Sequence, residues 1–351
     1  MHHDRELKLT ETNIAKGIAV ILLLIHHLFA FPDRLKYDYV SLFSLFHERG
    51  EFYVGHFGQI AITIFLFLSG YGLYKSNVQN PDHLIKKSYT RLKKIMINYW
   101  VVFLLFIPVG LYFFGNSDRF QNNSIMDFLR NFIALSSSYN GEWWFLYDYI
   151  LLLLIFPVTF QAFQRNAWVT LLIAGLVFYN SYSQGNYYSI MYWQLPFMMG
   201  LFFAKYKLYS WISKIYNFII FNNIIFDIII IVVLFRFRTT SQLFEKTTID
   251  MIIAPLFILV SIHLMSKLKL TKVFAYLGKS SMNIWLTHTF FCYYYFQNIV
   301  FLPRVSILIL LWLVLLTVLT SIIVNSIITI INNKLYSKYI DLSSNHVGRQ
   351  V

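Results

Sequence analysis

The chain has 351 residues, of which 58% are hydrophobic and only 13% are charged, with 29 Lys and Arg against 16 Asp and Glu. Soluble domains carry about a quarter charged residues, so this chain lacks the polar side chains that would cover a water-soluble globule. The net charge of +13 does not indicate nucleic-acid binding, because the basic residues are scattered among apolar runs, and the single cysteine excludes a disulfide framework and a cysteine-rich metal site.

Hydropathy predicts an all-α, polytopic bundle of about ten membrane-spanning helices, since about 20 apolar residues cross the hydrocarbon core of a bilayer. The predicted spans are residues 14–31, 55–74, 96–115, 143–161, 167–183, 190–206, 216–235, 249–266, 276–296 and 305–331. We expect one membrane domain over residues 1–351, with a short tail at 332–351. The longer loops, 32–54 and 116–142, are too short to be catalytic domains, so any chemistry occurs within the bundle or at its two mouths.

The distribution of basic residues predicts the orientation of the bundle. If the N-terminus is cytoplasmic, 20 of the 29 Lys and Arg lie in the inner segments. Cytoplasmic loops of membrane proteins carry this excess of positive charge. We therefore expect both termini in the cytoplasm.

The first span carries an ionisable residue near each end of an apolar run, Lys16 and His27. Eleven residues at 100° each return to nearly the same helix face, about 16 Å further along the axis. Ionisable groups inside membrane helices usually mark functional sites, and a neutral imidazole can act as a general base. The structural alternative is that Lys16 lies at the interface and that His27 is a packed, hydrogen-bonded residue. The adjacent His26 points to another face, which favours a structural role.

A basic segment from Lys75 to Lys94 is predicted as an inner loop before the third span. Arg91 and Lys94 are three residues apart and share a helix face. Such a patch suits the phosphates of a nucleotide cofactor such as coenzyme A. Topology alone also places basic residues here, without any ligand.

Small and acidic residues stand out near other span ends. Ser69 and Gly70 end the second span, where small side chains allow close approach of another helix or of an acyl chain. Glu142 and Trp144 lie at the outer mouth of the fourth span, with Asp148 one to two turns deeper. Tryptophans there are typical of an interfacial belt, whereas acidic groups so close to hydrocarbon need a partner.

The ninth span contains a polar strip. Asn283, Thr287 and His288 follow the run Gly278 to Ser281. We expect Asn283 and His288 to support the site, although His288 is also consistent with a packed residue that hydrogen-bonds Ser or Thr. No cluster at metal-ligand spacing, phosphate loop or nucleophile elbow is found, so no metal is expected.

Together these motifs resemble the acyltransferase-3 family of integral membrane acyltransferases, which modify cell-surface sugars. The resemblance covers residues 10 to 330 and rests on the basic residue and histidine of the first span, the Phe65 to Tyr71 segment, Arg91 with Lys94, Trp144 to Leu146, and Leu277 to His288. Lysine replaces the usual arginine at positions 16 and 94, which keeps the charge but loses the bidentate fork.

The resemblance implies a bacterial inner-membrane, multi-pass enzyme that transfers an acetyl group from acetyl-CoA to a glycan hydroxyl. The glycan would be of the capsule, teichoic acid or lipopolysaccharide type. Arg91 and Lys94 would bind the donor phosphates, the pantetheine arm would pass Ser69 and Gly70, and His27 would be the general base or an acetyl relay. Lys16 would bind the donor or support His27.

Two alternatives stay open from the sequence. A transporter or flippase of a lipid-linked oligosaccharide would also have many spans and buried charges, although its charges would be spread over many helices. Nothing in the sequence separates transfer to a hydroxyl from transfer to an amine.

Overall fold

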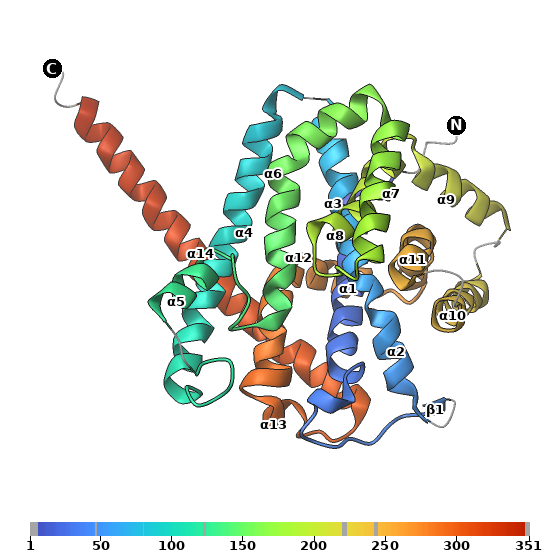
Figure 1. The fold of residues 1–351 in the computed structure, drawn as a ribbon, viewed down its shortest axis with the longest axis horizontal. Coiled ribbons are helices and arrows are strands. Elements are labelled where there is room, and N and C mark those ends of the chain that lie inside the picture. The colour runs from blue at the N-terminus through green and yellow to red at the C-terminus, as the bar shows by residue number, and fades with distance from the viewer. Residues whose placement is uncertain are drawn as a thin grey trace.

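The computed structural model describes residues 6–45, 48–79, 81–121, 124–219, 223–241 and 245–347. These residues form an almost entirely helical chain (Figure 1). The α-helices are α1 (Leu9–Phe29), α2 (Gly50–Gly58), α3 (Ile60–Asn77), α4 (Leu84–Phe113), α5 (Ile125–Phe132), α6 (Trp144–Arg165), α7 (Ala167–Ser183), α8 (Ile190–Lys205), α9 (Leu208–Ile219), α10 (Ile224–Thr240), α11 (Lys246–Lys267), α12 (Thr271–Thr289), α13 (Gln297–Val300) and α14 (Ser306–Val347).

Short elements occupy the connections. Three are 3-10 turns, η1 (Pro32–Arg34), η2 (Pro81–His83) and η3 (Gly141–Trp143), and η4 (Phe290–Tyr294) is a π-helical turn that continues α12. The strands β1 (Ser44–Leu45) and β2 (Glu48–Arg49) pair antiparallel. The prediction of an all-α fold is confirmed by this element list.

Six helical segments among the described residues are long and apolar enough to cross a membrane. They are Leu9–Phe29, Gly50–Asn77, Pro81–Phe113, Gly141–Arg165, Lys246–Lys267 and Ser306–Asn333. The helix Ala167–Ser183 is apolar but shorter. The chain therefore has several membrane helices, and each of the ten predicted spans overlaps at least one helix of the structure.

Two of the predicted spans are interrupted. The span 216–235 is wrong as a single helix, because residues 216–219 belong to α9 and residues 224–235 to α10; residues 220–222 lie outside the described ranges. Asn223 starts the new helix, since its side chain accepts a hydrogen bond from the backbone N–H of Ile225. The span 55–74 starts earlier, at Gly50, and is broken at Gln59 between α2 and α3.

The basic segment and the C-terminal tail are also more helical than predicted. Helix α4 begins at Leu84, so Arg91 and Lys94 lie on a helix rather than in a loop. The tail predicted at 332–351 continues α14 as far as Val347, and residues 348–351 lie outside the described ranges. In Figure 1 this helix leaves the bundle, whereas α9, α10 and α11 lie together on the opposite side.

Two reciprocal glycine contacts bring the central helices together. A Cβ on Gly17 of α1 would overlap the backbone of Phe274 in α12, and a Cβ on Gly278 of α12 would overlap the backbone of Asn13 in α1. Gly70 of α3 and Gly200 of α8 approach each other's helices in the same way. Small residues permit such close backbone packing in membrane helices. The pairs α1–α12 and α3–α8 are accordingly the most extensive interhelical contacts.

Candidate active site

One cavity of about 710 Å³ extends between the central helices. Lys16, Arg91 and Lys94 line it at what we call the basic end. His27 and Glu142 line it at the histidine end. The 11-residue spacing in α1 therefore has the predicted consequence, because both Lys16 and His27 line one continuous space.

The basic end gathers three positive charges. Lys16 of α1 is close enough to Arg91 and Lys94 of α4 to experience electrostatic repulsion from both. In the described part of the chain, no carboxylate forms an ion pair with any of the three. Converging cations without a counter-ion favour an anionic ligand, and phosphate groups are the common partners of such clusters.

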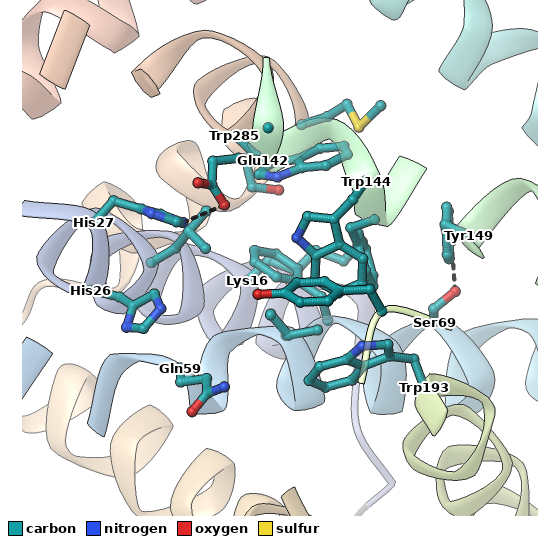
Figure 2. Close-up of a pocket in the computed structure, with 18 of the residues that line it drawn as sticks. Lys16, His26, His27, Gln59, Ser69, Glu142, Trp144, Tyr149, Trp193 and Trp285 are labelled. Carbon is teal, nitrogen blue, oxygen red and sulfur yellow. Dashed lines mark hydrogen bonds and ion pairs between the residues drawn. The ribbon is translucent and has the colours of Figure 1, made fainter. Parts of the chain in front are cut away.

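The histidine end is organised around a carboxylate. Oε2 of Glu142 lies 3.8 Å from Nε2 of His27, while Oε1 accepts a hydrogen bond of 2.9 Å from Arg34. Figure 2 shows the carboxylate facing the imidazole across the cavity. The backbone N–H of Glu142 donates to the side chain of Asn140, which starts η3 and sets the position of the acid. Glu142 thus has the partners that an acidic group near hydrocarbon requires.

Arg34 is held in place by charge and by aromatic rings. Its guanidinium lies 4.5 Å from the centre of the Phe31 ring and 5.4 Å from that of Tyr293. Burial would lower the pKa of Arg34, but the neighbouring Glu142 carboxylate raises that pKa above its usual value. Arg34 therefore remains charged through the neutral pH range.

Two further histidines flank His27. Nδ1 of His26 donates to the carbonyl of Gly55 at 2.9 Å, and Nδ1 of His288 donates to the carbonyl of Trp285 at 2.6 Å. A carbonyl only accepts, so in both rings Nδ1 carries the proton and Nε2 is the acceptor. The ring centre of His27 lies 5.0 Å from that of His26 and 4.8 Å from that of His288.

Hydrogen bonds within the described chain leave one ring nitrogen of His27 and one of His288 unused. Nδ1 of His27 and Nε2 of His288 are buried, and neither has a hydrogen-bond partner among the described residues. The other ring nitrogen of His27, Nε2, faces the Glu142 carboxylate.

A wall of aromatic side chains lines the cavity, and of its members the sequence analysis had singled out Trp144 as a site candidate. Its members come from four helices and one loop, and they are Phe65, Trp144, Phe145, Tyr149, Tyr187, Tyr188, Trp193 and Trp285. Figure 2 shows Trp144, Trp193 and Trp285 around the same space. Ser69 is fixed beside them by a hydrogen bond of 2.6 Å to the Tyr149 hydroxyl. Amphipathic rings of this kind combine apolar contact area with hydrogen-bonding edges.

Four predicted site residues do not line the cavity, namely Gly70, Asp148, Asn283 and His288. Gly70 contacts α8, which is the helix-packing alternative for the small residues of the second span. Asp148 is buried in α6 outside the lining. Asn283 donates hydrogen bonds to Ser321 and Asn325 of α14. His288, on the same polar strip of α12, packs against the ring of His27 instead.

Arg34 and Gln59 line the cavity but were not singled out from the sequence. Arg34 had one available signal, since it is a basic residue on the predicted outer side, against the general charge bias. Gln59 had no such signal in the sequence, because its place in the cavity depends on the break between α2 and α3.

Apolar helices around this cavity define a multi-pass membrane protein that has a cationic cluster and a histidine–carboxylate pair in one continuous space. A family model described as an acyltransferase domain, Acyltransferase 3, matches residues 10–326, and the chain therefore belongs to this family of membrane acyltransferases. The comparisons with curated proteins and with solved structures found no match.

Proposed function

We propose that this acyltransferase moves an acetyl group from cytoplasmic acetyl-CoA to a hydroxyl of a cell-surface or lipid-linked glycan in a bacterial inner membrane. The observation that supports the proposal most directly is the single cavity that contains both the cationic cluster and His27. We further propose that both termini are cytoplasmic, so that the basic end faces the donor and the histidine end faces the acceptor. The excess of Lys and Arg in the inner segments supports this orientation.

The donor fits the basic half of the cavity. Its phosphates would contact Arg91, Lys94 and Lys16, which have no carboxylate partners in the described chain. The pantetheine arm is a slender extended chain, comparable in length with the roughly 16 Å rise from Lys16 to His27. It would pass Ser69 and bring the thioester carbonyl to the histidine end.

The transfer would use His27 as a general base. The acceptor hydroxyl gives its proton to Nε2 of His27 as its oxygen attacks the thioester carbonyl carbon. The carbon–sulfur bond then breaks, and the leaving thiolate takes the proton from the His27 imidazolium. The products are an acetyl ester and the free coenzyme thiol. The Glu142 carboxylate, 3.8 Å from Nε2, stabilises the imidazolium while it exists.

The acceptor half of the cavity suits a sugar ring. Pyranose rings have apolar C–H faces and polar edges, which match the aromatic wall and the polar side chains Arg34, Gln59 and Glu142. Capsular, teichoic acid and lipopolysaccharide-type glycans all carry such rings. The chain's own residues support this class of acceptor without selecting one member.

Mass spectrometry of surface polysaccharide tests the proposal. Cells with the gene should carry one additional acetyl unit per repeat, removable by mild alkali, and cells with the His27→Ala variant should resemble cells without the gene. Membranes supplied with radiolabelled acetyl-CoA should label the same glycan. Alkali-stable acetyl groups would indicate transfer to an amine. An unchanged acetyl content with loss of the whole glycan from the surface would favour the flippase and overturn the proposal.

A further inference from the structure

A second groove lies on α4 next to the basic end of the main cavity. It has a volume of about 460 Å³ and is lined by His83, Lys86, Lys87, Thr90, Arg91 and Lys94. Arg91 and Lys94 line both this groove and the main cavity. The two spaces therefore lie next to each other at these side chains.

Helix geometry makes the lining a continuous polar strip. Residues three and four apart share a helix face, so Lys87, Arg91, Lys94 and Asn98 follow one another along α4. Asn98 already lines the main cavity. At 1.5 Å per residue, the strip extends roughly 12 Å from Lys94 back to Lys86.

The charges of this strip are uncompensated in the described chain. No carboxylate forms an ion pair with Lys86, Lys87, Arg91 or Lys94. Lys87 is anchored by its hydrogen bond of 2.5 Å to the carbonyl of Ser76, which keeps a cation at the edge of the groove. The cations of the groove continue those of the basic end, so the two spaces together suit a ligand with more than one anionic group.

We propose that this groove binds the ribose 3′-phosphate of the acyl-CoA donor, while Arg91 and Lys94 hold its pyrophosphate. The inference rests on the proposed function, since it specifies the donor of that same site. It assigns Lys86 and His83 to a phosphate that lies beyond the main cavity. The protein then discriminates coenzyme A from 3′-dephospho-coenzyme A, which has the same pantetheine arm and pyrophosphate.

Binding measurements on the full chain in phosphatidylcholine nanodiscs test this subsite, with coenzyme A and 3′-dephospho-coenzyme A as probes. We expect coenzyme A to bind about tenfold more tightly, as for one charge-assisted phosphate contact. Lys86→Met should remove most of this difference and leave the affinity for the dephospho form unchanged. Lys93→Met is the matched control, because Lys93 is an exposed cation on the same helix that does not line the groove. It should preserve the difference.

The outcomes separate this inference from the proposed function. Equal affinities for the two probes would overturn the 3′-phosphate subsite and leave the donor proposal intact. Failure of both probes to bind would overturn the donor proposal itself. If Lys93→Met removed the affinity difference as strongly as Lys86→Met, the difference would come from the overall positive charge of α4, and the subsite would be overturned. Equal affinities together with phosphatidylglycerol binding that depends on Lys86 would assign the groove to a lipid headgroup.

Discussion

Replacing Glu142 with Gln isolates the electrostatic role of the carboxylate that faces His27. The substitution keeps the size of the side chain and its ability to accept from Arg34, but removes the negative charge. The carboxylate and Nε2 of His27 are 3.8 Å apart, with side chains that are 16% and 8% exposed. At this distance, the attraction between unit charges is about 4 kcal/mol at an effective dielectric constant of about 20, and about 1 kcal/mol in water.

The attraction applies only while His27 is protonated, so it lowers the barrier and does not strengthen donor binding. Repulsion from Arg34 offsets part of it. We therefore expect Glu142→Gln to lower kcat by about ten- to a hundredfold, with the donor KM nearly unchanged. Radiolabelled acetyl transfer on membranes, normalised to folded protein extracted in detergent, gives both constants.

Asp38→Asn is the matched control for Glu142→Gln. Asp38 lies in the loop before β1 and pairs with Arg49 at 2.6 Å, so its replacement removes the same charge away from His27. It should leave kcat unchanged. Full activity of Glu142→Gln, or an equal loss in both variants, would refute the role of Glu142 in stabilising the imidazolium.

Three further predictions follow from α1 and its partners. His27→Ala should abolish transfer with normal extraction yield. His26→Ala should retain activity and lose about 1 kcal/mol of stability, because it removes a buried hydrogen bond to a backbone carbonyl. Thermal unfolding and transfer assays compare the two variants, and full activity of His27→Ala would contradict the assignment. Lys16→Arg should keep substantial activity and Lys16→Met should lose it, because methionine keeps the length but deletes the charge; a fully active Lys16→Met enzyme would make Lys16 an interfacial anchor. Gly278→Ala should lower the free energy of unfolding by about 1–3 kcal/mol, since the added Cβ overlaps the Asn13 backbone. An unchanged thermal unfolding temperature would contradict the close contact between α1 and α12.

The sequence by itself determined the features that depend on local periodicity. The apolar composition predicted membrane helices, and the described residues include six segments that are long and apolar enough. The 11-residue spacing in one helix predicted a common face for Lys16 and His27, and both line the cavity. These inferences succeeded because 3.6 residues per turn and the thickness of the hydrocarbon core apply to any helix, whatever its neighbours.

The tertiary structure decided which of the singled-out residues meet. Glu142 reaches Arg34 across 108 residues, and the aromatic wall combines side chains from four helices and a loop. Gly70 and Asn283 face neighbouring helices instead of the cavity, although nothing in the local sequence of Gly70 distinguishes it from Ser69, which lines the cavity. Helical periodicity gives a residue's face, but the packing of helices distant in the chain decides whether that face meets a partner helix or an open cavity.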